Sequence, residues 1–143
     1  MYKRILIPLD NSPTDKAILD HIRPLAKLTG AELTLVHVAD GFAARLQGEL
    51  NLVDSQEITE DHAYLDIIRK ELVEKGFKVK AILVQGKDPG EGILTIANQE
   101  GCDLIAMATH GHTFVKDVIL GSVAENLRHR TDIPILMIRS SVK

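Results

Sequence analysis

Five short apolar runs, separated by longer segments with helical periodicity, limit what this chain can fold into. The first run has two isoleucines in five residues, which is typical of a strand buried on both faces. Strands that alternate with helices form a parallel sheet covered by helices on both sides. We therefore predict an α/β fold, a three-layer sandwich made by one domain over residues 1–143, with strands at 5–9, 31–39, 79–84, 104–108 and 133–138.

The segments between the strands carry typical helix signals. Ser12 precedes Pro13, and an acidic residue follows three positions after Ser12, so we predict that Ser12 caps the first helix. Gly30 is the predicted end of that helix. A long amphipathic helix is predicted over 55–75, and Asp88 is the predicted cap of the next helix.

Four other features carry structural predictions. Residues 40–54 lack clean periodicity and are predicted to be a mobile or variable connection. Pro24 lies inside the first helix and should remove a backbone bond or bend the helix. Pro134 stands near the start of the last run, which favours an edge strand. His37, near the end of the second strand, is predicted to be a buried histidine with its hydrogen bonds satisfied.

Composition and charge exclude several classes of protein. The chain is 45% hydrophobic and 26% charged, with a net charge of −3, unlike a disordered or a membrane protein. No basic stripe with aromatic residues occurs, so we expect no nucleic-acid partner. No apolar segment reaches bilayer length and the N-terminus lacks a signal peptide, so we expect no membrane partner and a cytoplasmic location. Cys102 is the only cysteine, which excludes an internal disulfide.

The segment 107–122 joins the fourth predicted strand to the last helix. Gly111 lies in the loop, and Gly121 with Ser122 opens the helix. The first N–H groups of a helix lack partners and carry partial positive charge, and glycine lets the main chain approach a ligand closely. This pattern is typical of a phosphate-binding loop. An ordinary strand-to-helix connection, in which Ser122 only caps the helix, explains the same spacing.

Spacing excludes several other sites. No Gly-x-Gly-x-x-Gly follows the first strand and no Gly-x4-Gly-Lys-Ser/Thr occurs. A phosphoreceiver domain needs an acidic pair after strand one and an aspartate after strand three, whereas here Asp10 stands alone and strand three runs into Gln85. His110 and His112, with Asp117 nearby, make an incomplete metal site.

Five segments together form a recognisable pattern: 3–12 (KRILIPLDNS), 33–38 (LTLVHV), 103–111 (DLIAMATHG), 121–127 (GSVAENL) and 133–138 (IPILMI). With these segments the chain resembles the universal stress protein family over essentially its whole length. The nucleotide-binding branch of that family carries Gly-x2-Gly-x9-Gly-Ser/Thr. Gly111, nine intervening residues, Gly121 and Ser122 match that motif, and Ala108 replaces its first glycine.

The resemblance implies an adenine nucleotide, ATP or AMP, bound between strands one and four of a sheet with order 3-2-1-4-5. Asp10 would accept a hydrogen bond from a ribose hydroxyl, and the main chain of Val38 would face the adenine edge. Mg²⁺ or Mn²⁺ could accompany ATP, although the sequence indicates no dedicated ligand. The implied site residues are Pro8 and Leu9 near the base, Asp10, Val38, Met107 as apolar cover, Ala108, Thr109 and His110 at the bend, and Gly111, Gly121, Ser122 and Val123 around the phosphates.

Ala108 is the main departure from the family motif. A methyl group at this position is tolerated if the backbone has negative φ. If the position needs positive φ, or if the phosphates pass where Cβ lies, binding weakens or shortens towards AMP.

Three functions remain open. The first is a dimeric regulatory module of the stress response that binds nucleotide. The second is a dimeric interaction protein without nucleotide, since the resemblance implies a homodimer through the strand 133–138. The third is a weak ATPase in which Asp10 or His110 orients water. Phosphoryl transfer usually needs a cationic clamp, a metal ligand and a group that orients the nucleophile, and the loop offers Lys116 at best, so we expect no efficient enzyme.

Overall fold

The computed structural model describes residues 1–40, 51–86, 88–110 and 123–140 of the chain. Strands and helices alternate through the described ranges, as the sequence predicts. Residues 123–127 are also helical. The elements are β1 (Arg4–Pro8), α1 (Thr14–Thr29), β2 (Glu32–Asp40), α3 (Asn51–Glu74), β3 (Val79–Gly86), α4 (Pro89–Gln99), β4 (Leu104–His110) and β5 (Ile135–Ser140).

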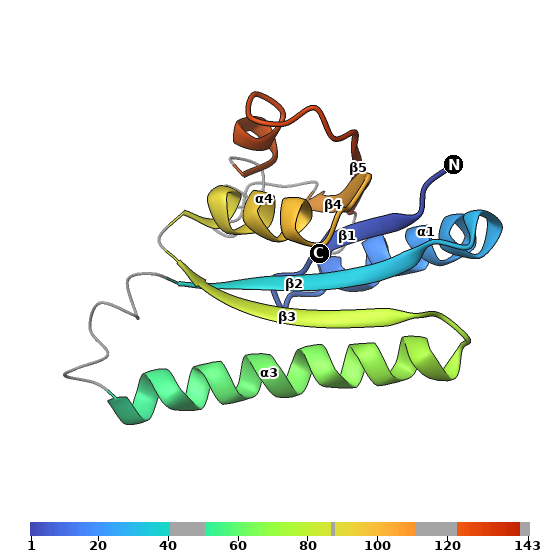
Figure 1. Cartoon of the computed structure of the whole chain (residues 1–143). Helices are drawn as coiled ribbons and strands as arrows, with labels where there is room; N and C mark the ends of the chain where they lie inside the picture. Colours follow the sequence, from blue (N-terminus) through green and yellow to red (C-terminus); the bar gives the residue numbers. More distant parts are fainter. Residues whose placement is uncertain (41–50, 87, 111–122, 141–143) are drawn as a thin grey trace.

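The strands form one five-stranded sheet with the order β3-β2-β1-β4-β5 (Figure 1). Every neighbouring pair is parallel. The predicted fold class and strand order are therefore confirmed. Parallel pairing brings the carboxyl ends of all the strands to the same edge of the sheet.

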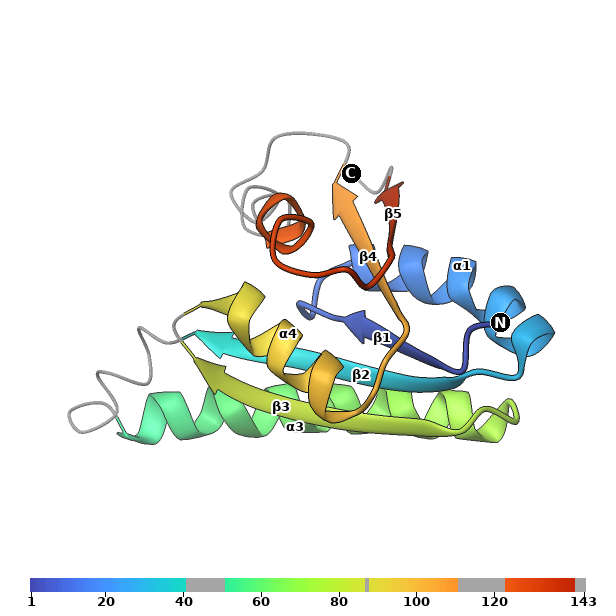
Figure 2. The same ribbon diagram turned by 45° about the horizontal axis from the view of Figure 1, so that its top comes forward.

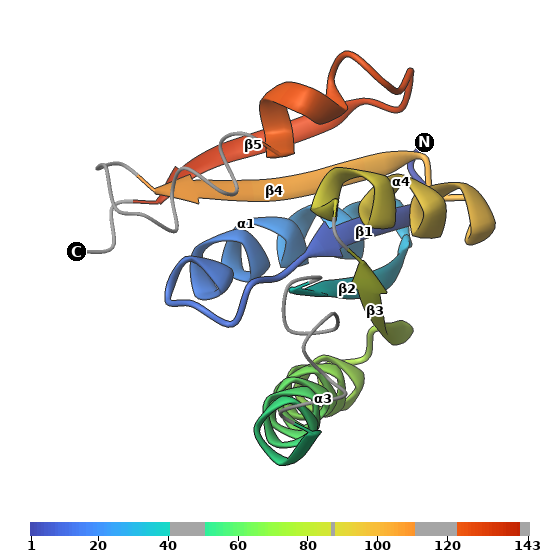
Figure 3. The same ribbon diagram turned by 90° about the vertical axis from the view of Figure 1, so that its left-hand side faces the viewer.

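Helices cover both faces of the sheet because alternate residues of each strand face opposite sides. Ile5 and Ile7 of β1 lie in one apolar cluster with residues of α1 and α3. Leu6 lies in a second cluster with residues of α4 and Leu127. In Figure 2, α4 passes in front of the sheet while α1 and α3 lie behind it. Figure 3 shows α1 and α4 on opposite sides of the sheet. The three predicted layers are thus present.

The predicted cap at Ser12 is wrong. The N-cap position of α1 is Pro13, which makes no side-chain cap bond, and the helix begins at Thr14. The Ser12 hydroxyl instead bonds to Asp10 and to Thr14. The prediction failed because a hydroxyl finds these local side-chain partners as readily as the helix N–H groups.

Two other predicted helix signals, at Asp88 and Gly30, are borne out. Asp88 caps α4, accepting the N–H groups of Gly90 and Glu91 at 3.0 and 3.4 Å. Gly30 ends α1 in the left-handed conformation, with φ of 72°. Helix α1 runs on through Pro24 to Thr29.

Four predicted boundaries are corrected. Strand β3 extends to Gly86 rather than residue 84, because Gln85 and Gly86 remain paired with Ala39 and Asp40 of β2. Strand β4 extends to His110 rather than Ala108, because Thr109 and His110 remain paired with Arg139 and Ser140 of β5. Strand β5 covers Ile135–Ser140 rather than 133–138. Helix α3 begins at Asn51, so only residues 41–50 of the predicted connection lie outside the described ranges.

Strand β5 is an edge strand, as Pro134 predicts. Met137 on this strand is 50% exposed. In the described part of the chain, no helix combines the length and apolar character that crossing a bilayer requires.

We predict that Asp88→Ala lowers the free energy of unfolding by about 1 kcal/mol, because α4 loses its cap. Arg130 forms an exposed ion pair with Asp88 at 3.1 Å, so Arg130→Met serves as the control that removes only this pair. It should cost less than about 0.5 kcal/mol. Urea denaturation measures both, and equal losses in the two variants would contradict a capping role.

Candidate functional site

The candidate site lies where the strand order reverses. Strands β1 and β4 are neighbours in the sheet although β2 and β3 come between them in sequence. Ligands of such sheets bind outside the carboxyl ends of the strands at this point. Strand β1 pairs with β2 as far as Pro8, but with β4 only at Ile5 and Leu6.

Pro8 gives a physical reason for the early end of the β1–β4 pairing. Even-numbered residues of β1 direct their main-chain groups towards β4, since the carbonyl of Arg4 accepts the N–H of Asp103 at 2.9 Å. Odd-numbered residues face β2, since Leu9 donates its N–H to the carbonyl of Val36 at 2.8 Å. Position 8 should supply the next N–H towards β4, and proline has none.

The main chain that leaves β1 is held by the side chain of Asp15. Its Oδ1 accepts the N–H of Asp10 at 3.2 Å, and its Oδ2 accepts those of Asn11 at 2.9 Å and Ser12 at 3.3 Å. Asn11 has φ of 59°, in the left-handed region that asparagine tolerates better than most residues. This turn brings three successive N–H groups to one carboxylate.

Asp10, the predicted ribose contact, has one carboxylate oxygen engaged. The Ser12 hydroxyl donates to Oδ1, and it also lies 2.6 Å from the Thr14 hydroxyl. Asp10 also lies against the carboxyl group of Asp15, with which it shares a side-chain hydrogen bond. The residue is only partly buried. A carboxylate has about four lone-pair sites, so Asp10 keeps acceptor capacity for a ligand hydroxyl.

Asp15 is a buried carboxylate, 3% exposed. Burial raises its pKa to about 7, the neighbouring charge of Asp10 acts in the same direction, and a 2.6 Å hydrogen bond from the Tyr64 hydroxyl opposes both. Burial and this hydrogen bond raise the pKa of Tyr64 above its ordinary value. Tyr64 is therefore a neutral donor at physiological pH. The sequence signal for Asp15 was its position three residues after Ser12, but its three N–H partners and Tyr64 were missed.

His37 connects the end of β1 with α3. Its Nδ1 lies 2.8 Å from the carbonyl oxygen of Leu9, and its Nε2 lies 3.1 Å from Oδ2 of Asp61. A carbonyl oxygen can only accept, so Nδ1 carries a hydrogen and donates it. The predicted histidine is hydrogen-bonded, but it is partly exposed, with 16% of its side chain accessible, rather than buried.

Val38 lies beyond the last pair between β1 and β2, which is Pro8 with Val36. Main-chain groups alternate between the two edges of a strand, so Val38 directs its N–H and C=O to the same edge as Val36. Strand β1 has ended there. The main chain of Val38 therefore faces the region beside Leu9, as the predicted contact with an adenine edge requires.

The predicted site residues Met107 and Ala108 of β4 face opposite sides of the sheet. Met107 is 1% exposed and lies in the apolar cluster with α4, which Val123 joins from the last helix. Ala108 is 4% exposed and faces the opposite cluster, beside Leu9 and α1. Its φ is not positive, since Asn11 is the only described non-glycine residue with that feature. The backbone objection to a methyl group at 108 is thus removed.

The bend predicted at Thr109 and His110 is wrong, because both residues belong to β4. The glycine motif at 111 and 121 and the Ser122 hydroxyl lie outside the described residues, as do His112 and Asp117 of the rejected metal site. Among the described residues, no three His, Cys, Asp or Glu side chains are grouped to hold a metal ion.

A hollow of about 340 Å³ lies at the opposite, amino-terminal edge of the sheet. Its lining includes Arg4 with Glu32, and Lys80 with Glu100, which pair with each other at 3.6 and 2.7 Å. These four charges are therefore already paired. This hollow lacks the switch-point geometry of the carboxyl edge.

The fold is a doubly wound α/β sandwich with an aspartate, and main chain without a strand partner, at its switch point. The sequence profile of the Universal stress protein family matches residues 1–139. The chain belongs to this family.

Curated relatives and solved structures agree. The chain is 37% identical to Universal stress protein MJ0577 of Methanocaldococcus jannaschii, over 97% of this chain and 96% of that protein. The crystal structure of MJ0577 superposes with a TM-score of 0.86, covering 100% of this chain and 99% of that one. A universal stress protein from Burkholderia pseudomallei is 31% identical, with a TM-score of 0.75 and 97% of both chains covered.

We predict that Asp15 makes stability depend on pH. Its pKa is about 7 in the folded chain and 3.8 as the ordinary value, so the folded state retains a proton that the unfolded state loses. The contribution is complete below pH 3.8 and is lost as pH rises towards 7, by roughly 1.4 kcal/mol per unit of the difference. Urea denaturation from pH 4 to 7 should show wild type losing stability relative to Asp15→Asn. Parallel pH profiles would contradict this.

Proposed function

We propose that this chain binds an adenine nucleotide, ATP or AMP, at the carboxyl ends of β1 and β4, and acts as a regulatory module of the stress response. The observation that supports this most is the fixed position of Asp10. The Asp15 carboxyl accepts its main-chain N–H and the Ser12 hydroxyl donates to its Oδ1, and the carboxylate keeps acceptor sites for a further donor. A carboxylate held in this way is suited to recognise a ribose hydroxyl, since hydrogen bonds to charged groups are strong.

The main chain of Val38 supports a base on the β2 side of Asp10. An adenine edge offers both a donor and an acceptor, and a main-chain N–H and C=O match this pair. Pro8 and Leu9 are buried at this edge and would lie near the base. Met107 is buried in the core, so it would support the pocket from behind.

The fold itself is compatible with an adenylate. One structure with this fold is described as a universal stress protein in complex with cAMP, at 18% identity and a TM-score of 0.70. Another, from Archaeoglobus fulgidus, is described as a complex with dAMP, at 22% identity and a TM-score of 0.65. At these identities the likeness concerns the fold.

The residues proposed to bind the phosphates are predicted from the sequence alone. Gly111, Gly121, Ser122 and the N–H of Val123 would receive the phosphates, with His110 nearby and Mg²⁺ or Mn²⁺ as an optional companion of ATP. Weak ATPase activity and a cytoplasmic location are likewise predictions from the sequence alone.

A homodimer through residues 133–138 is part of the proposal. Strand β5 is at the edge of the sheet and exposes Met137 by 50%. An apolar edge strand is a template for pairing, and a second copy of the same strand can pair across a two-fold axis. The alternative function, an interaction protein that dimerises without nucleotide, shares this surface.

Calorimetry with ATP, ADP and AMP should show saturable binding by the wild type. Asp10→Ala should weaken it at least tenfold, because a hydrogen bond to a charged group contributes about 1.5–3 kcal/mol. Asp66→Ala on the outer side of α3 is the matched control and should bind normally. No binding by the wild type would favour the interaction protein.

The phosphate side is tested separately. Gly121→Val should abolish binding of ATP, and normal affinity would contradict the phosphate-loop assignment. Sustained ADP release that disappears in Asp10→Ala, with binding retained, would favour the ATPase.

For the dimer, Met137→Lys should shift the mass measured by light scattering from two chains to one, because the lysine charge opposes pairing of the edges. Leu28→Lys, at another exposed apolar residue, is the control and should leave the mass unchanged. A wild-type monomer at high concentration would rule out the proposed pairing.

A further inference from the structure

Two side chains of α3, Asp61 and Tyr64, are linked through His37 and Asp15 to the main chain that follows β1. Asp61 bonds to His37 Nε2 at 3.1 Å, and His37 Nδ1 bonds to the Leu9 carbonyl at 2.8 Å. Tyr64 donates to Asp15 at 2.6 Å. Asp15 in turn accepts the N–H groups of residues 10, 11 and 12. Both series of hydrogen bonds therefore end on residues 9–12, the segment that contains Asp10.

Both series of hydrogen bonds start from one face of α3. Asp61 and Tyr64 are three residues apart, so they are neighbours on the surface of α3. Leu65, Ile68 and Leu72 of the same helix pack on the sheet with apolar contacts. A carboxylate and a hydroxyl in such an interface lose hydration, which is unfavourable unless they find partners. Here the partners are His37 and Asp15, which themselves hold the segment 9–12.

We infer that Asp61 and Tyr64 of α3 are positioning residues for the nucleotide site, fixing Asp10 through His37 and Asp15. These four residues, Asp61, His37, Tyr64 and Asp15, are named the α3 tether. The inference rests on the proposed function and adds to it: the position of α3 controls how tightly the ribose is recognised. Neither Asp61 nor Tyr64 touches the nucleotide.

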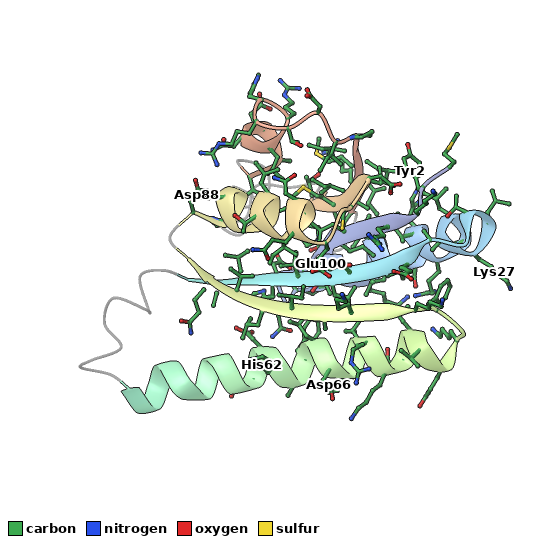
Figure 4. The ribbon with its side chains drawn as sticks, viewed as in Figure 1. Tyr2, Lys27, His62, Asp66, Asp88 and Glu100 are labelled. Carbon is green, nitrogen blue, oxygen red and sulfur yellow. The ribbon has the colours of Figure 1, made fainter. Side chains whose placement is uncertain are left out.

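The chain offers matched controls for both positions. Tyr2 is its only other tyrosine. Figure 4 shows Tyr2 at the end of the molecule opposite Asp88, far from the carboxyl ends of the strands. Asp66 lies on α3 and pairs with Arg69 and Lys70 of the same helix at 2.8 and 3.0 Å. Tyr2→Phe and Asp66→Asn thus make the same chemical changes as Tyr64→Phe and Asp61→Asn, outside the α3 tether.

The experiment compares ATP with 2′,3′-dideoxy-ATP by calorimetry. Wild type should prefer ATP, because the analogue lacks the hydroxyls that Asp10 would contact. Tyr64→Phe should lower the affinity for ATP about tenfold, the effect of losing one hydrogen bond to a charged group. It should leave the affinity for the analogue nearly unchanged. The preference should likewise shrink in Asp61→Asn and persist in both controls. A general loss of stability would lower both affinities together and keep their ratio.

Each other outcome has a defined meaning. An unchanged preference in both Tyr64→Phe and Asp61→Asn would overturn the inference, and so would equal affinity of wild type for the two ligands. If wild type binds neither ligand, the proposed function fails, and amide hydrogen exchange decides on the α3 tether alone. Faster exchange at residues 10–12 in Tyr64→Phe than in Tyr2→Phe supports the α3 tether, and equal exchange overturns it.

Discussion

The hydrogen bonds of one buried carboxylate organise the functional edge of this molecule. Main chain that leaves a strand needs acceptors for its N–H groups, and a buried N–H without a partner is rare and costly. Asp15 accepts three successive N–H groups after β1 and a fourth bond from Tyr64. The turn at Asn11, the position of Asp10 and the polar contact made by Tyr64 of α3 depend on this one side chain.

The absence of a hydrogen-bond donor is equally important to the site. Pro8 has no N–H to offer at the position where β1 would continue to pair with β4. The pairing of these strands covers Ile5 and Leu6 only, whereas β4 and β5 remain paired through His110. One side of β1 is thus released just before Asp10, while the apolar clusters on both faces hold the rest of the sheet. A rigid scaffold and a released edge are what a ligand site at a switch point requires.

Local patterns predicted the fold, and tertiary contacts explain most of what they missed. The alternation of apolar runs and capped helices gave the three layers, and Asp88 and Gly30 were read correctly because their partners are within four residues. Ser12 was misread because its hydroxyl had several local partners. The length of β4 depends on β5, and the role of Asp15 depends on Tyr64, 49 residues away in sequence. Asp10 and Val38 lie near the carboxyl ends of β1 and β2, but their contacts with a nucleotide stay predictions, as does the glycine motif at 111 and 121.

The central claim is that an adenylate binds at the carboxyl edge, beside Asp10 and Val38. Titration of the ¹⁵N-labelled chain with AMP, followed by amide chemical shifts, tests it most directly. The account predicts that the largest shifts occur at residues 10–12, at Val38 and at Val123, and that they saturate together. Shifts confined to the hollow beside Arg4 and Glu32, or no saturable shifts at all, would contradict it.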